Sequence, residues 1–208
     1  MGVHPEDAAT YCDEVESALR ALATAPEVVA VGEIGLDYHY EGPPRPVQQR
    51  VFSRLISLAR EVRKPIVVHT RDAAADTLEI LERESAHDVG GIIHCFSEDK
   101  SFATRVLDLG FDISFSAIVT FKSARSVAEV AAWVPADRIL VETDSPYLAP
   151  PPFRGKRCEP AYLVHTAAHL ARLRGLKPED FAATLVANTE RRFAKVLARA
   201  SRSDVEDV

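Results

Sequence analysis

The sequence is poor in cysteine and contains no long hydrophobic run. Its three cysteines are an odd number and lie far apart, which argues against a disulfide framework and for a reducing compartment. No apolar run approaches the roughly 18–20 residues that cross a membrane, and the N-terminus has no signal-peptide pattern. We therefore expect a cytoplasmic protein that does not interact with a membrane.

Positively charged residues are also fewer than negatively charged ones. Lysine and arginine number 25 against 31 aspartate and glutamate residues, which gives a formal net charge of −6. Because no global basic field attracts polyanions, a phosphate-bearing substrate must be held by local groups or by metal. The 208 residues suffice for one domain with a sizeable core. We expect a single domain over residues 1–200 and a disordered, charged tail at 201–208.

Short apolar runs alternate with helical patterns along the chain. Apolar residues three and four apart predict helices at residues 5–24, 47–63, 73–85, 99–109, 124–133, 161–173 and 178–197. Strands are predicted at residues 28–31, 65–68, 89–93, 111–119 and 139–141, with a strand-like stub at residues 1–4. This alternation predicts an α/β fold with parallel strands, closed into a TIM-type barrel. An open doubly wound sheet is the alternative.

Four of the apolar runs are followed, at their C-terminal ends, by a residue of a metal-binding type: Glu33, His69, His94 and Asp144. A single histidine after such a run is more often structural, and a buried carboxylate is costly unless it is paired or metal-bound. A barrel gathers the C-terminal ends of its strands at one mouth, so four such residues together indicate one metal site. Two histidines and two carboxylates suit Zn, Mn or Mg, and a carboxylate can bridge two metals. Asp144 and Glu33 are the candidate catalytic residues, with Asp144 as the acceptor of a proton from water.

Three further residues are candidates for contact with a substrate. Arg71 lies just beyond His69, and its guanidinium would fit a phosphate group. Arg154 begins a local basic cluster in the loop after Asp144. His4 follows the strand-like stub at the start of the chain. The alternatives are a surface ion pair or cap for Arg71, solvated surface for Arg154 and a structural role for His4.

Three polar residues lie next to the predicted ligands in the sequence. Glu142 lies two residues before Asp144, so alternation along a strand would point both to one side, and Glu142 is a candidate base or supporting acid. Cys95 follows His94 directly and is expected to point the other way, as a packed thiol. Asp37, in the loop expected after Glu33, is within possible reach of the barrel mouth.

Five stretches together resemble the TatD family of metal-dependent deoxyribonucleases, a branch of the amidohydrolase-like barrels. The stretches are GVHP at residues 2–5, GEIGLDY at 32–38, VHTR at 68–71, HCFS at 94–97 and ETDSPYL at 142–148. They occur in the family's order and span nearly the whole chain. The resemblance implies a βα barrel, up to two divalent metal ions and a nucleic acid substrate, DNA above all.

The resemblance also implies roles for individual residues. Glu33 would bridge the two metals, and His69 and His94 would bind one of them. Asp144 would bind the other metal. Three residues would line the substrate groove: His4, Arg71 and Arg154.

One part of the family pattern is missing. Members of the family begin with a strand that carries a His-x-His pair, and this sequence contains no His-x-His. We therefore expect a barrel without its first two strands and an incomplete second metal site.

Three functions follow as hypotheses. The first is a metal-dependent nuclease, a hydrolase of phosphodiester bonds that acts on DNA as an exonuclease with a metal-activated water. The second is a metal-dependent ester or amide hydrolase, such as an aminoacyl-tRNA deacylase, because the same barrel and ligands serve both reactions. The third is a non-catalytic remnant with weak metal binding. No obligate protein partner is evident from the sequence.

Overall fold

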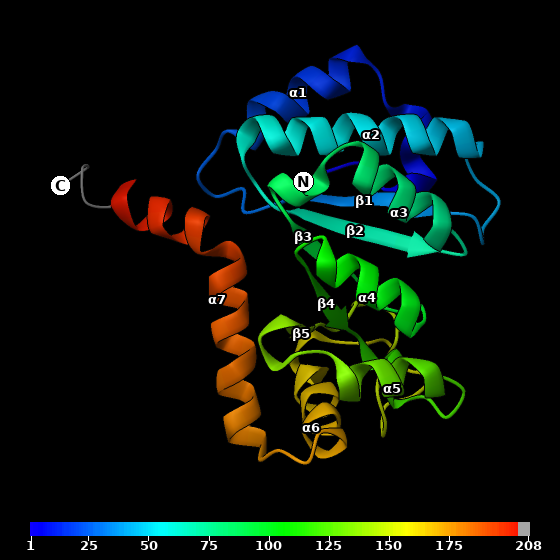
Figure 1. Cartoon of the computed structure of the whole chain (residues 1–208), viewed down its shortest axis with the longest axis vertical. Coiled ribbons are helices and arrows are strands. Elements are labelled where there is room, and N and C mark those ends of the chain that lie inside the picture. The colour runs from blue at the N-terminus through cyan, green and yellow to red at the C-terminus, as the bar shows by residue number, and fades with distance from the viewer. Residues whose placement is uncertain (204–208) are drawn as a thin grey trace. The chain divides into compact units, whose positions relative to one another are not determined.

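The computed structural model describes residues 1–203, with side chains described to residue 193, and divides into two compact units (Figure 1). Unit 1 comprises Met1–Ile92, Leu109–Phe111 and the described residues from Glu190 onward. Unit 2 comprises Ile93–Asp108 and Asp112–Thr189. The single domain expected over residues 1–200 stays a prediction.

Unit 1 is built around two parallel strands and the helix that covers them. Its elements are η1 (Pro5–Thr10), α1 (Asp13–Ala23), β1 (Val31–Asp37), α2 (Arg45–Val62), β2 (Ile66–Arg71), α3 (Ala74–Arg83), η2 (Ala86–Asp88) and the first residues of β3 (Gly91–Ile93). Strand β1 pairs with β2 in parallel, so that Gly35 lies opposite His69. Helix α2 buries Phe52, Leu55 and Ile56 and packs along β1, with α1 on its other side (Figure 1).

Unit 2 carries the second parallel pair. Its elements are α4 (Lys100–Asp108), β4 (Phe111–Phe115), η3 (Ala117–Thr120), α5 (Arg125–Trp133), η4 (Ala136–Arg138), β5 (Ile139–Val141), η5 (Pro160–Tyr162), α6 (Leu163–Leu173) and the first part of α7 (Pro178–Ser203). Strand β4 is buried throughout and pairs in parallel with β5. The Asn188 amide joins α7 to β5, because it donates to the carbonyl oxygens of Ala136 and Ile139, both at 2.8 Å.

The strand order is β1-β2-β3-β4-β5, the same as the order along the chain. Sequential neighbours with helices between them are the arrangement of βα units. The predicted α/β class with parallel strands is confirmed.

Strand β1 begins later than the apolar run predicts. The expected strand was residues 28–31, but β1 covers Val31–Asp37. The reason lies in its partner: Pro65 has no N–H to donate, so the ladder on β2 starts at Ile66, which pairs with Val31. Glu33 therefore lies inside the strand, and Asp37 is its last residue.

Two further predicted boundaries are wrong. Residues 5–24 form two helices, because Tyr11 and Cys12 are extended and Cys12 starts a new helix whose first turn carries acidic residues, which its N-terminal dipole favours. The strand expected at 111–119 ends at Phe115, since the Ser116 hydroxyl accepts the Ile118 N–H and caps η3.

The two ends of the chain also differ from expectation. Residues 1–4 are not assigned to a strand, although the Met1 carbonyl accepts the Gly32 N–H at 2.8 Å. Helix α7 continues through Ser203, so the first residues of the expected tail are helical. The rest of that tail, 204–208, lies outside the described residues. Within the described chain, no helix combines the length and the apolar composition needed to cross a membrane.

Candidate metal centre

Glu33 and His69 meet on neighbouring strands of unit 1. The parallel register places Gly35 opposite His69, and Glu33 Oε1 lies 2.9 Å from His69 Nδ1. Gly35 makes this approach possible, since a Cβ at that position would lie 2.0 Å from the His69 carbonyl oxygen. Its φ of 143° also lies in a region that other residues rarely adopt. The glycine is therefore part of the local architecture that brings a carboxylate beside an imidazole.

Asp37 holds the other nitrogen of the same imidazole. Its Oδ2 lies 2.9 Å from His69 Nε2, and the residue is only 2% exposed. Asp37 Oδ1 accepts the backbone N–H groups of His39 and Tyr40 at 2.9 and 3.1 Å. Burial raises the pKa of the Asp37 carboxyl, but the hydrogen bonds from His69 and the backbone outweigh it, so the pKa is lowered overall. Asp37 is a buried, charged anchor for the ring.

His69 is thus bracketed by two carboxylates. Burial lowers the pKa of His69, while hydrogen bonds to Glu33 and Asp37 raise it, and the net shift is upward. When both ring nitrogens are protonated, each donates to one of the two carboxylates. A cation bound between Nδ1 and Glu33 would take the place of the Nδ1 proton, while the Nε2–H still donates to Asp37. An imidazole whose second nitrogen donates to a buried carboxylate is the usual arrangement of a metal ligand. The donor set of Glu33 and His69 therefore fits a divalent cation.

His4 completes a group of three in unit 1. The possible ligand atoms of His4, Glu33 and His69 all lie within 4.8 Å of one another. His4 caps η1, and its Nδ1 accepts the Glu6 N–H at 3.3 Å, so in the neutral ring Nε2 carries the proton. That Nε2 lies 3.7 Å from Glu33 Oε1. Burial, then the neighbouring His69, lowers the pKa of His4 and so favours the neutral ring. Because Nδ1 accepts the Glu6 N–H, the Nε2–H is a donor for an acceptor such as a substrate oxygen.

Arg71 ends strand β2 on the same side as His69, because side chains two residues apart share a face. Its Nη1 donates to the Tyr40 hydroxyl at 3.0 Å, and its guanidinium lies 4.7 Å from the centre of that ring. The aromatic contact holds the guanidinium in place while leaving further N–H donors for another acceptor.

In unit 2, His94 is held by the same kind of contact. His94 Nδ1 lies 2.9 and 3.0 Å from the two carboxylate oxygens of Glu142. Glu142 also accepts the Cys95 N–H at 2.7 Å and the Ser114 hydroxyl at 2.8 Å, so several donors fix it. With the Nδ1 proton directed to Glu142, the lone pair is on Nε2, which lies 3.6 Å from Asp144 Oδ1.

Alternation along a strand predicts that Cys95 points away from this group, but its thiol lies beside it. Its φ of 45° breaks the alternation, and Sγ lies 3.1 Å from Ser116 Oγ and 3.8 Å from Asp144 Oδ2. His94, Cys95 and Glu142 form a second group with ligand atoms within 4.8 Å. Burial and then Glu142 raise the pKa of the Cys95 thiol, so the thiolate that a metal needs is disfavoured. Asp144 is the better second ligand beside His94.

The basic loop of unit 2 places Arg154 against an aromatic ring. Its guanidinium lies 3.5 Å from the centre of Phe121. The predicted ligands thus form two groups, Glu33 with His69 in unit 1 and His94 with Asp144 in unit 2. A single site that contains all four stays a prediction.

Sequence reasoning predicts only one of the two anchoring carboxylates, and that one in part. Glu142 is expected as a base or supporting acid, whereas Asp37 is expected in a loop with no predicted contact to His69. A signal was present for Asp37: residues 33, 35 and 37 share one face of an extended strand, so Glu33 and Asp37 flank the same neighbour. For Glu142, the partner His94 is 48 residues away in the sequence, and no local sequence pattern predicts that contact.

Comparison with known proteins agrees with this donor chemistry. Residues 1–194 match the family model of TatD-related DNases. The metal-dependent hydrolase YcfH of Escherichia coli K12 is 50% identical over 192 residues, which cover 92% of this chain and 72% of that protein. A protein of Citrobacter koseri named 3'-5' ssDNA/RNA exonuclease TatD is 36% identical over 197 residues, covering 92% of this chain and 76% of that protein.

A solved structure extends the likeness to three dimensions. The TatD homologue YjjV of Escherichia coli K12 superposes with a TM-score of 0.87 at 29% identity, over 93% of this chain and 75% of that one. The TIM-type barrel class expected from the alternating strands and helices is confirmed by this likeness. With the family model spanning almost all of its length and a relative half identical to it, the chain belongs to the TatD family of metal-dependent hydrolases.

Proposed function

We propose that the chain hydrolyses phosphodiester bonds of nucleic acid, as an exonuclease that acts on DNA. The observation that carries this proposal is a pattern that occurs twice. His69 lies between Asp37 and Glu33, and His94 lies between Glu142 and Asp144. In each case one carboxylate is fixed by further donors and orients the ring, while the other faces the remaining nitrogen. The name of the Citrobacter relative supports nucleic acid as the substrate.

In unit 1 Glu33 and His69 would hold a metal ion, and in unit 2 His94 and Asp144 would do so. Their mixed imidazole and carboxylate set suits Zn or Mn, and the carboxylates suit Mg. When bound, a divalent ion polarises a phosphoryl oxygen and lowers the pKa of a water molecule toward neutrality.

The proposed roles of Asp144, His4 and Arg71 follow from the positions of their side chains. The Asp144 side chain is 29% exposed, so its carboxylate is open to solvent and can take the proton of an attacking water. The Nε2–H of His4 and the guanidinium of Arg71 are donors for phosphate oxygens. Because these groups contact phosphate rather than base edges, we expect poor sequence specificity.

The test is a substrate panel at defined metal concentrations. It comprises end-labelled single-stranded DNA, RNA and double-stranded DNA beside an aminoacyl ester, each with Mg, Mn or Zn. We expect stepwise shortening of labelled DNA, and a loss of kcat by about 10²–10⁴-fold in Asp144→Asn, the range for a general base. Asp180→Asn, at an exposed position on α7, is the charge-matched control. Turnover of the ester with intact DNA would contradict the proposal and favour an acyl hydrolase.

A further inference from the structure

Tyr40 is an exposed aromatic side chain close to the candidate ligands of unit 1. It lies in the segment after β1, where its backbone N–H donates to Asp37 Oδ1 at 3.1 Å. The other oxygen of that carboxylate lies 2.9 Å from His69 Nε2, so Asp37 connects this segment to a candidate metal ligand. Tyr40 nevertheless stays 53% exposed, so its ring adds little to the core. The ring is therefore available for a contact outside the protein.

Two neighbours position the Tyr40 ring without covering it. Arg71 Nη1 donates to the Tyr40 hydroxyl at 3.0 Å, and the guanidinium lies 4.7 Å from the centre of the ring. The His39 ring meets the Tyr40 ring at an interplanar angle of 87°, with 4.9 Å between the two centres. A side chain that is positioned before a ligand arrives loses less conformational entropy on binding.

Arg71 joins this exposed ring to a group that can bind phosphate. A guanidinium has five N–H donors and binds phosphate oxygens in pairs, and the bond to the Tyr40 hydroxyl uses one of the five. Base and phosphate of one nucleotide are joined through a single sugar. A phosphate bound at Arg71 therefore brings a base close to the ring that Arg71 contacts.

We propose that Tyr40 stacks on a base of the bound nucleic acid while Arg71 contacts the adjoining phosphate. This inference rests on the proposed function, because it takes nucleic acid as the substrate, and it adds a contact made to a base. Every base has a flat aromatic face, so such stacking tolerates any sequence. The competing role for Tyr40 is to position Arg71 alone, in which case its effect on binding does not depend on a base.

Two matched ligands separate stacking on a base from contact with phosphate. One is a labelled oligothymidine, and the other is an oligonucleotide of the same length whose sugars carry no base, so both present the same phosphates. Each is titrated into metal-loaded protein that carries Asp144→Asn to suppress hydrolysis, and fluorescence anisotropy measures the affinity. We expect the oligothymidine to bind about ten-fold more tightly, within the range for stacking of one base on an aromatic ring.

Variants at position 40, made in the same Asp144→Asn protein, assign this preference to the tyrosine ring. Tyr40→Leu should abolish the preference for the oligothymidine, whereas Tyr40→Trp keeps an aromatic face and should retain it. Trp133→Leu is the matched control, because Trp133 is 40% exposed on α5 and also has a cation on its ring, Lys100 Nζ at 4.5 Å. The control should keep the full preference. An equal loss of affinity for both ligands in Tyr40→Leu would show that Tyr40 only positions Arg71 and would overturn the proposal.

The same titrations distinguish failure of this inference from failure of the proposed function. If the parent protein binds both ligands equally well, stacking on Tyr40 is wrong and the proposed nuclease function still stands. If it binds neither ligand, the proposed function and the stacking contact are overturned together.

Discussion

At the scale of single residues, the two histidines of the candidate metal centre are positioned before any metal binds. A carboxylate on one nitrogen selects the tautomer and fixes the ring plane, and Asp37 and Glu142 provide these contacts. Sequence reasoning found Glu33, His69, His94 and Asp144 as candidates because each follows or continues an apolar strand. It offers the role of a supporting acid for Glu142 but only a place near the barrel mouth for Asp37, because an anchor is defined by a contact in space and not by its residue type.

Replacing Asp37 by asparagine tests the anchor role. The variant keeps the size of the side chain but removes the charge that holds His69 Nε2. We expect affinity for the metal to fall by about 10–100-fold, as for other such supporting groups. Metal content after dialysis against metal buffers is the measurement. Asp72→Asn is the control, because Asp72 lies on the exposed surface, where it pairs with His39 and has a φ of 53° that asparagine accepts. Equal metal content in both variants would count against the anchor.

Tyr38 gives a prediction of pH dependence. Its hydroxyl donates to Asp76 at 2.7 Å and accepts from Gln49 at 2.9 Å. Burial, then the bond to Asp76, raises the pKa of Tyr38 to about 12. Because the folded state favours the neutral phenol, this contribution to the free energy of unfolding is complete below pH about 10 and is lost as the pH rises toward 12.

Urea unfolding between pH 9 and 12 measures this contribution. Tyr38→Phe has no phenol proton, so we expect its free energy of unfolding to fall less over that range than that of the native protein. Tyr147→Phe, at a side chain that is 70% exposed, should follow the native curve. Parallel curves for the native protein and Tyr38→Phe would show that Tyr38 does not contribute.

At the scale of elements, the sequence predicts the helices and strands better than it predicts where the strands begin. The helix expected at 47–63 is α2 at Arg45–Val62, because its apolar face has an unbroken helical spacing. The strand expected at 28–31 is β1 at Val31–Asp37, because the partner strand decides where a ladder starts. Cys95 was placed on the wrong side for a related reason, since its positive φ is a property of the loop that follows β3.

Gly35 is the residue on which the pairing of β1 with β2 depends most directly. A methyl group there would meet the His69 carbonyl oxygen at 2.0 Å, and backbone atoms cannot move aside without parting the strands. We expect Gly35→Ala to lower the free energy of unfolding by about 3 kcal/mol or more, from strain and clash together. Metal affinity should fall with it, since the contact of Glu33 with His69 is displaced.

Gly42→Ala is the matched control for this element. Position 42 has no atom within 4 Å of the added Cβ, so the substitution should be almost neutral. Denaturant unfolding and metal content are measured for both variants. A Gly35→Ala protein as stable as Gly42→Ala would contradict the register that joins Gly35 to His69.

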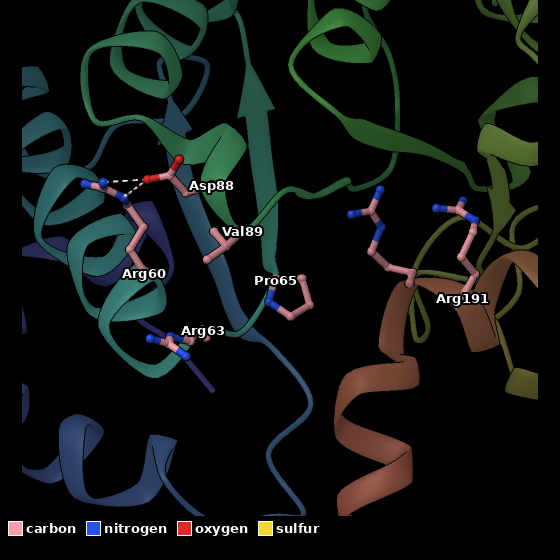
Figure 2. A pocket seen from close by; sticks show the side chains of 7 residues that line it. Arg60, Arg63, Pro65, Asp88, Val89 and Arg191 are labelled. Carbon is pink, nitrogen blue, oxygen red and sulfur yellow. Dashed lines mark hydrogen bonds and ion pairs between the residues drawn. The ribbon is translucent and has the colours of Figure 1, made fainter.

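At the scale of the whole molecule, the alternation of strands and helices was enough to predict the barrel class, and the motifs were enough to predict the family. A cavity of about 420 Å³ in unit 1, lined in part by arginine side chains, was not predictable in this way (Figure 2). Its four arginines come from the end of α2, the turn after it and α7, more than a hundred residues further on. None of them stands in a motif, and each taken alone reads as a solvated surface charge.

Under the proposed function, the net charge of −6 bears on how nucleic acid would be held. A polyanion is repelled by the chain as a whole, so binding depends on the few cations that touch phosphate, and each such contact contributes to the salt dependence. If Arg71 and Arg154 each neutralise one phosphate of a single strand, the plot of log K against log salt has a slope of about −1.4, and Arg154→Ala should reduce it to about −0.7. Fluorescence anisotropy of a labelled oligothymidine over a range of KCl measures both slopes.

Arg157→Ala removes the same charge from the same loop at an exposed position and should leave the slope unchanged. A slope that Arg154→Ala does not alter would show that this guanidinium, although held on Phe121, contacts no phosphate.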